Sequence, residues 1–248
     1  MRKPLIFGHR GVPCEAPENT VASFQRAVEL GLDGVELDVQ LCKSGELVVF
    51  HDFRVDKLTD GTGLVADLSF EEIRRLDAGS HFSEKFRNER IPTLEEVLGI
   101  LGGRMLVNVE LKQETLGDRG LESRASGLIK KMGLSTSVIL SSFNPFSIWR
   151  AGRAQPDMAC ALLFADDQPL HLRRAWAARV LELDGLHPRF PLISDALMKR
   201  ARAKGWFVGT WTVDDPREAE RLVEAGVDII ISNRPAQLRE ELNLRRTA

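Results

Sequence analysis

Residues 34–39 read GVELDV, an apolar segment into which two acidic side chains are set. On a β-strand, residues two apart share a face, so Glu36 and Asp38 point to one side while the valines and the leucine point to the other. Two like charges on one face of a core strand are costly to bury, because the loss of hydration and the mutual repulsion add. The segment therefore predicts a positive group between the two carboxylates.

Residues 107–112 read VNVELK and repeat the pattern, with Glu110 and Lys112 on the polar face of a second strand. If the two strands are parallel neighbours, Glu36, Asp38 and Glu110 converge on one point. Three carboxylates without cysteine or a local histidine cluster form a hard, oxygen-only site of the kind that Mg²⁺ or Ca²⁺ prefers. The sequence thus predicts one divalent cation; the alternative is a set of buried ion pairs, such as Glu36 with Lys112.

Short apolar runs bounded by turn residues recur along the whole chain, with amphipathic segments between them. Near-continuous apolar runs are typical of a sheet that is covered on both faces, and alternation with helices favours parallel pairing. Eight such units predict an α/β fold, a (β/α)8 TIM barrel, in a single domain over residues 1–248. The eight expected strands are Leu5–Gly8, Gly34–Gln40, Met105–Lys112, Val138–Phe143, Cys160–Phe164, Val180–Leu186, Trp206–Thr212 and Asp228–Ser232.

Helix boundaries are marked by residues that cap helices. Capping boxes pair a hydroxyl residue with a glutamate three positions later, a cap can also precede a first-turn proline, and glycines stand where helices should stop. The start signals are Asn19-Thr20, Ser69 with Glu72, Thr93 with Glu96, Asn144-Pro145 and Asp215-Pro216, and the stop signals are Gly31, Gly205 and Gly226.

The connection between the second and third expected strands is unusually long, with about 60 residues. It predicts a small insertion, at about residues 46–95, which contains an extra strand near Glu46–His51. Because it follows the carboxyl end of a barrel strand, the insertion should lie over the mouth of the barrel, where such folds place their active sites.

Bulk composition restricts partners and compartment. The chain has 248 residues and a formal charge of −2, which argues against a nucleic-acid partner. Cys14, Cys42 and Cys160 are an odd number without metal-ligand spacing, and they are expected to be reduced thiols. No apolar stretch approaches the ~18 residues of a membrane span, and the N-terminus lacks a signal segment. We expect a cytoplasmic protein without stable membrane association.

Two histidines stand at strand ends. His9 follows the first expected strand and precedes Arg10, and His51 ends the extra strand. Alone, each could equally be a capping or core residue. Together, they suit a reaction in which one group activates a nucleophile and another protonates a leaving oxygen, as in phosphodiester cleavage. Arg10 and Lys112 could then neutralise a phosphate.

The remaining histidines have no carboxylate partner at strand spacing and are expected to be structural or surface residues. They are His81, His171 and His187, the last of which could lie at the end of the sixth strand.

Several short motifs, in this order, resemble the glycerophosphodiester phosphodiesterase family over nearly the whole chain. They are His9-Arg10-Gly11, Ala16-Pro17-Glu18-Asn19-Thr20, Glu36-Leu37-Asp38-Val39, Val49-Phe50-His51-Asp52, Val109-Glu110-Leu111-Lys112, Ser141-Ser142-Phe143, Gly209-Thr210-Trp211-Thr212-Val213 and Asn233-Arg234-Pro235. Cys42 and Asn233 depart from the residues that this family more often has, and Asn233 leaves any supporting role at the eighth strand in doubt.

The resemblance implies a (β/α)8 barrel with an insertion after the second strand and a site with assigned roles. By this likeness Glu36, Asp38 and Glu110 hold the metal, His9 and His51 are the acid and base, Arg10 and Lys112 contact phosphate, Glu18 supports the metal site, and Phe143 and Trp211 line the alcohol pocket. For Trp211, packing inside the barrel is an equally good interpretation.

The expected activity is metal-dependent hydrolysis of a small-molecule glycerophosphodiester to sn-glycerol 3-phosphate and an alcohol. One alternative is a lysophospholipase D-type enzyme on the same scaffold, which needs an exposed apolar rim or a membrane anchor. Another is a catalytically silent barrel that binds a phosphodiester. The sequence leaves open the alcohol, the metal, which histidine is the acid, whether water or the glycerol 2-hydroxyl attacks, and the oligomeric state.

Overall fold

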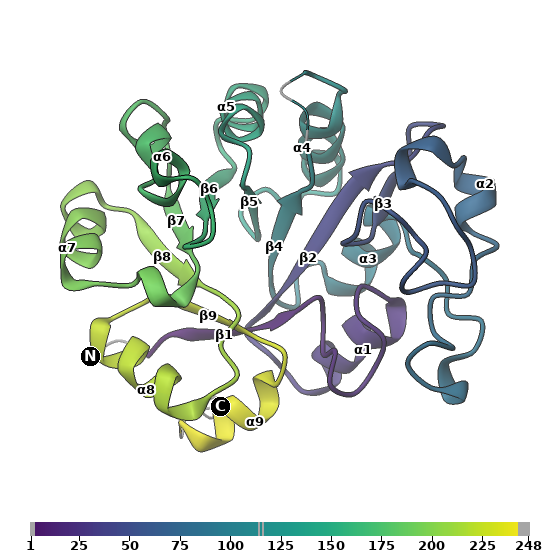
Figure 1. Cartoon of the computed structure of the whole chain (residues 1–248), viewed down its shortest axis with the longest axis horizontal. Helices are drawn as coiled ribbons and strands as arrows, with labels where there is room; N and C mark the ends of the chain where they lie inside the picture. The colour runs from purple at the N-terminus through teal and green to yellow at the C-terminus, as the bar shows by residue number, and fades with distance from the viewer. Residues whose placement is uncertain (1–2, 114, 116, 243–248) are drawn as a thin grey trace.

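The computed structural model describes residues 3–113, 115 and 117–242, and within them eight parallel strands form a closed barrel inside a ring of helices (Figure 1). The ring closes because β1 pairs in parallel with both β9 and β2. This confirms the predicted (β/α)8 barrel. The barrel strands are β1 (Leu5–His9), β2 (Gly34–Leu41), β4 (Leu106–Leu111), β5 (Val138–Ser142), β6 (Ala159–Phe164), β7 (Gly185–Pro188), β8 (Phe207–Thr210) and β9 (Ile229–Ser232).

Helices cover the outside of the barrel, and each of the five predicted start signals lies at the beginning of a helix. Both capping boxes are formed, at Ser69 and at Thr93. Gly205 and Gly226 end their helices with φ of 71° and 78°, values that favour glycine. The helices around the barrel are α1 (Val21–Glu29), α3 (Leu94–Leu101), α4 (Leu121–Lys131), α5 (Pro145–Ala154), α6 (Leu170–Arg173), α7 (Asp195–Lys204), α8 (Pro216–Ala225) and α9 (Pro235–Glu241), with the 3₁₀ turns η3 (Trp176–Arg179) and η4 (Phe190–Leu192).

Within the described part of the chain, none of these helices combines the length and the apolar composition needed to traverse a bilayer. The cytoplasmic location stays a prediction, and residues 1 and 2, which contributed to it, lie outside the described residues.

The sixth barrel strand differs from the prediction of Val180–Leu186. The strand is Gly185–Pro188, and Val180 instead follows η3 with 75% of its surface exposed. Leu181 and Leu183 pack against the apolar layer between strands and helices. They are therefore apolar because they anchor a connecting segment to the core, although they do not belong to a β-strand. The predicted strand was therefore misplaced by several residues towards the N-terminus.

The insertion lies between β2 and α3 and has its own small core. Its strand β3 (Leu47–Val49) pairs antiparallel with β2, and Gln40 at the end of β2 donates to the carbonyl oxygens of Phe50 at 2.8 Å and Asp52 at 2.9 Å. These bonds fix the segment around His51 beside the carboxyl end of β2. The rest of the insertion comprises η1 (Val65–Asp67), α2 (Phe70–Ile73) and η2 (Glu84–Phe86), packed on a core of Cys42, Val48, Phe50, Val55, Val65, Ile73, Ala78 and Ile91.

The barrel interior is apolar at its amino-terminal end, where it is filled by a group of side chains that includes Phe7, Ile139 and Ile229. His187 of β7 is fully buried beside Phe207, with ring centroids 5.8 Å apart, and neither ring nitrogen has a hydrogen-bond partner among the described residues. Burial lowers the pKa of His187 from 6.5 to about 4, so the ring is neutral near pH 7.

This burial predicts a pH-dependent stability. Below pH 6.5 the unfolded chain protonates His187 while the folded protein does not, so folding stability is fully present above pH 6.5 and is lost as the pH falls towards 4. Replacing His187 with Leu should reduce the loss between those limits by up to about 3 kcal/mol. Urea unfolding of both proteins at several pH values tests this; an equal loss in both proteins would contradict it.

Candidate functional site

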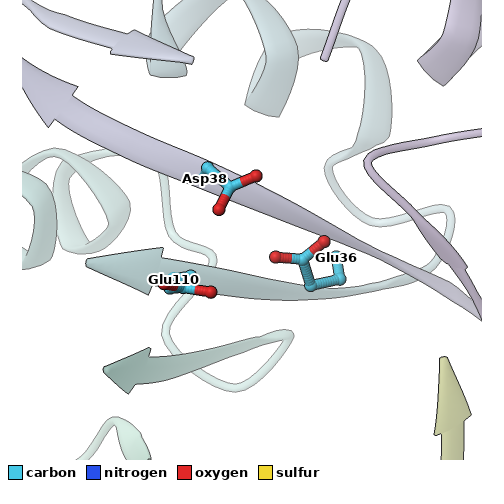
Figure 2. Close-up of side chains that lie close together, drawn as sticks. All are labelled: Glu36, Asp38 and Glu110. Carbon is cyan, nitrogen blue, oxygen red and sulfur yellow. The ribbon is translucent and has the colours of Figure 1, made fainter. Parts of the chain in front are cut away.

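Three carboxylates meet at the carboxyl end of two neighbouring strands. Asp38 of β2 lies opposite Glu110 of β4, and Glu36 precedes Asp38 on the same face. One oxygen from each lies within 4.8 Å of the others, and the three carboxyl groups face one another (Figure 2). All three residues are buried, with exposures of 4%, 1% and 8% for Glu36, Asp38 and Glu110. The structure thus brings together the three predicted metal ligands.

Two cationic side chains contact this carboxylate cluster. The Nζ of Lys112 lies 3.1 Å from Glu110 and 3.7 Å from Asp38, and the Nε of Arg10 lies 3.3 Å from Asp38. Glu36 accepts only the backbone N–H of Arg10, at 3.1 Å, and no Lys or Arg of the described chain forms an ion pair with it. Buried ion pairs therefore exist, but two cations leave one of the three carboxylates uncompensated.

The pKa values follow from this charge balance. Burial raises the pKa of Glu36 well above its usual range, and the charges of Asp38 and Glu110 raise it further. Burial also raises the pKa of Glu110, to about 7, against the opposing effect of Lys112. For Asp38 burial acts upward too, but Arg10 and Lys112 outweigh it and lower the pKa to about 2. The cluster is therefore short of positive charge, most of all at Glu36.

The loop that begins at Arg10 supplies several of the groups that offset the negative charge of the carboxylate cluster. Arg10 itself has a φ of 54°. A side chain at Gly8 would meet the carbonyl oxygen of Gly11 at 2.0 Å, so the close approach within this turn requires glycine. The predicted supporting residue Glu18 accepts from the Nη1 of Arg10 at 2.6 Å, so it contacts the cluster through Arg10. Asn19, expected only as part of a helix cap, donates from Nδ2 to Asp38 at 3.0 Å.

His9 lies at the end of β1, with Nε2 3.9 Å from Glu36. Its Nδ1 lies 2.7 Å from the amide oxygen of Asn233, which can only accept, so Nδ1 carries the proton. Asn233 is in turn fixed by Asp214, which accepts from its backbone N–H and from its Nδ2, each at 2.7 Å. Burial lowers the pKa of His9 to about 4, with Arg10 adding to the effect. His9 is thus a neutral imidazole with Nε2 free to accept a proton.

His51 approaches from the insertion. Its Nδ1 lies 2.6 Å from Oδ1 of Asp52, a contact between an imidazole and a carboxylate. Both histidine rings line one small cavity of about 60 Å³ together with two of the carboxylates. The two predicted catalytic histidines are therefore brought to the same cavity, although 42 positions separate them in the sequence.

The cavity has an aromatic outer wall. Phe143 and Trp211 meet edge to face, with centroids 5.5 Å apart, and the Nε1 of Trp211 donates to the carbonyl oxygen of His187 at 2.9 Å. Both rings also border a wider, neighbouring cavity of about 550 Å³, which reaches Asp167 and Arg189. Trp211 therefore both packs within the barrel mouth and lines open space, so the two interpretations of this residue are compatible.

Asn108 is a site residue to which the sequence assigned no role. It lies opposite Glu36 in the strand register and lines the same small cavity. Its side chain is buried, and neither of its amide atoms has a partner within the described chain. Its polar position between Val107 and Val109 was the available signal, because it shares the inward face with Glu110.

Comparisons with known proteins identify the family and the fold. Residues 9–237 match the Glycerophosphoryl diester phosphodiesterase family. The chain is 42% identical over 239 residues to a glycerophosphodiester phosphodiesterase of Caldanaerobacter subterraneus subsp. tengcongensis, covering 95% of this chain and 96% of that one. It is also similar in structure to an Oleispira antarctica phosphodiesterase solved in complex with the product sn-glycerol-3-phosphate, with a TM-score of 0.84, 29% identity and 97% coverage of each chain.

The carboxylate cluster predicts stabilisation by a divalent cation. After EDTA treatment, adding Mg²⁺ or Ca²⁺ should raise the melting temperature, because a cation that binds only the folded state contributes about 2.7 kcal/mol at a concentration of 100 Kd. For a chain of this size that corresponds to roughly 5–10 °C. Glu110→Gln should lose most of the shift, whereas Glu71→Gln on the exposed helix α2 should keep it. An unchanged shift in Glu110→Gln would place the cation elsewhere.

Proposed function

The chain belongs to the glycerophosphoryl diester phosphodiesterase family of enzymes, and from that premise we propose that it hydrolyses glycerophosphodiesters to sn-glycerol 3-phosphate and an alcohol. The proposal rests on one observation: two imidazoles and the carboxylate cluster lie at the same small cavity. The product bound to the Oleispira antarctica relative supports the same product class. A silent phosphodiester-binding barrel has no need for two imidazoles there.

We propose that Glu36, Asp38 and Glu110 hold one divalent cation. The donor set fits it: the donors are all oxygens, they lie within 4.8 Å of one another, and the buried Oδ1 of Asp38 has no hydrogen-bond partner among the described residues. Either Mg²⁺ or Ca²⁺ suits such ligands. When bound, the cation supplies a Lewis acid that polarises a phosphoryl oxygen.

Arg10 and Lys112 are suited to hold the phosphate of the substrate. Each already lies within 4 Å of a carboxylate of the cluster and keeps a small part of its side chain exposed, 16% for Arg10 and 11% for Lys112. Their charges can therefore reach a phosphate placed at the cavity. There they would donate to its non-bridging oxygens, where negative charge increases as the transition state forms.

The hydrogen bonds of the two histidines suggest different proton roles. His9 is held by the neutral amide of Asn233 and leaves Nε2 free, which suits a proton acceptor that activates the attacking hydroxyl. His51 is held through Nδ1 by the carboxylate of Asp52, a contact that orients the ring and suits a proton donor to the departing alcohol oxygen. We therefore assign His9 as the base and His51 as the acid.

Phe143 and Trp211 are suited to receive the alcohol portion. They separate the small cavity that contains the histidines from the wider one beside Asp167 and Arg189. A leaving alcohol that extends from the phosphate would lie against these two rings, whose apolar surface excludes water around the reacting bond.

Replacing either catalytic histidine should reduce turnover without unfolding the protein. His9→Ala and His51→Ala are each expected to lower kcat by about 10²–10⁴ on glycerophosphocholine, because each removes one proton transfer. His81→Ala, at an exposed histidine of the insertion, is the matched control and should keep normal turnover.

A substrate whose leaving group needs no proton distinguishes the acid from the base. With bis(p-nitrophenyl) phosphate, whose leaving group needs no proton, His51→Ala should recover much of its activity while His9→Ala should not. Recovery by His9→Ala alone would reverse the two roles, and near-normal kcat in both variants on glycerophosphocholine would refute the pair.

A substrate panel tests the activity itself. EDTA-treated enzyme should release no sn-glycerol 3-phosphate from glycerophosphocholine or glycerophosphoethanolamine until Mg²⁺ or Ca²⁺ is restored, because the carboxylate cluster needs the missing charge. Lysophosphatidylcholine, run in parallel, separates the lysophospholipase D alternative. If no diester were cleaved with either cation, the proposed function would fail; if only the lysolipid were cleaved, the alternative would replace it.

A further inference from the structure

One outer face of the barrel is unusually apolar. Of the seven large apolar side chains that are exposed within the described chain, five lie on α5 and on the segment that runs from α6 through η3. These two segments are neighbours in the outer ring (Figure 1). The five are Phe146, Trp149, Leu170, Trp176 and Val180, with exposures of 47%, 51%, 59%, 46% and 75%. We call this surface the α5–α6 face.

The α5–α6 face contains a shallow groove of about 350 Å³. Phe146 and Trp149 of α5 form one side, and Trp176 and Val180 form the other. No charged side chain lines the groove, which is therefore apolar throughout. Exposed apolar surface on this scale, gathered in one place, is typical of an interaction site.

The charge around the groove is mainly positive, and the exposed Glu182, which follows the groove residue Leu181, is the acidic side chain nearest to it in the sequence. Helix α5 and the segment from α6 to the end of η3, residues 145–154 and 170–179, contain five arginines and no Asp or Glu, although the whole chain has a formal charge of −2. Arg153 lies over the ring of Trp149, with Cζ 5.2 Å from the centroid. Arg150 is paired with Glu122, but the other four arginines are exposed and form no ion pair with any described residue. They are Arg153, Arg173, Arg174 and Arg179.

We infer that the α5–α6 face docks reversibly on the surface of an anionic phospholipid bilayer. Tryptophan rings suit the boundary between headgroups and acyl chains, and arginines around them suit lipid phosphates. A second copy of the chain fits less well, because a symmetric interface would set the five arginines of each face against those of the other, and Glu182 alone could not balance them. The contact is peripheral, consistent with the finding on membrane-spanning helices.

The position of the face connects docking with the proposed site. Phe143, which lines the carboxylate cavity, lies only three residues before Phe146, which lines the groove. Docking therefore places the barrel mouth beside the lipid surface. Diesters released from membrane lipids by removal of their acyl chains would be produced next to the enzyme that consumes them.

Vesicle sedimentation tests the inference with the full chain. The protein should bind vesicles of phosphatidylglycerol and phosphatidylcholine at low ionic strength, bind pure phosphatidylcholine vesicles much less, and dissociate in about 1 M salt. The double variant Arg153→Glu with Arg174→Glu should lower the partition coefficient at least ~20-fold, since each cation near such a surface contributes about fivefold. Trp149→Ala with Trp176→Ala should also lose binding.

Matched controls lie on the insertion. Arg75→Glu with Arg87→Glu changes two exposed arginines, and Phe82→Ala removes an exposed aromatic ring, so both should retain wild-type binding. Hydrolysis of soluble glycerophosphocholine should be unchanged in every variant, and far-UV circular dichroism checks folding independently of activity. Equal binding to both vesicle types, no binding by the wild type, or self-association that the tryptophan variants abolish would each overturn the inference.

Discussion

Mutual repulsion among three buried carboxylates is the constraint on which the site depends. Glu36, Asp38 and Glu110 project from two adjacent strands into the barrel mouth and are buried there, where like charges are most costly. The surroundings respond to this cost, because Arg10 and Lys112 approach the cluster, and Asn19 donates to Asp38. Their compensation is incomplete at Glu36, and the proposed divalent cation would supply the charge that remains.

The barrel explains why the site can combine residues from distant parts of the chain. Parallel strands end at one rim, so β1, β2 and β4 present His9 and the carboxylates side by side. The insertion adds what these strands lack, because β3 pairs with β2 and carries His51 to the same rim. The strand ladder fixes the carboxylates and His9, while the insertion supplies His51.

The parts of the site that follow from strand periodicity were predictable from the sequence. Alternation in residues 34–39 and 107–112 was enough to predict the carboxylate cluster, and capping residues located most helices. Contacts between distant segments were not predictable in this way. The hydrogen bond from His9 to Asn233 spans 224 positions, and Asn19 resembled a helix cap. The sixth strand was misplaced because apolar residues that pack a connection have no local signal to distinguish them from a strand.

The central claim is that a divalent cation binds between Glu36, Asp38 and Glu110. Anomalous diffraction from a crystal soaked in Mn²⁺ tests it directly, since Mn²⁺ prefers the same oxygen ligands and can be located by its own signal. The account predicts one strong peak within about 2.0–2.6 Å of an oxygen of each of the three carboxylates. A peak elsewhere, with the three carboxylates still paired only to Arg10 and Lys112, would contradict it.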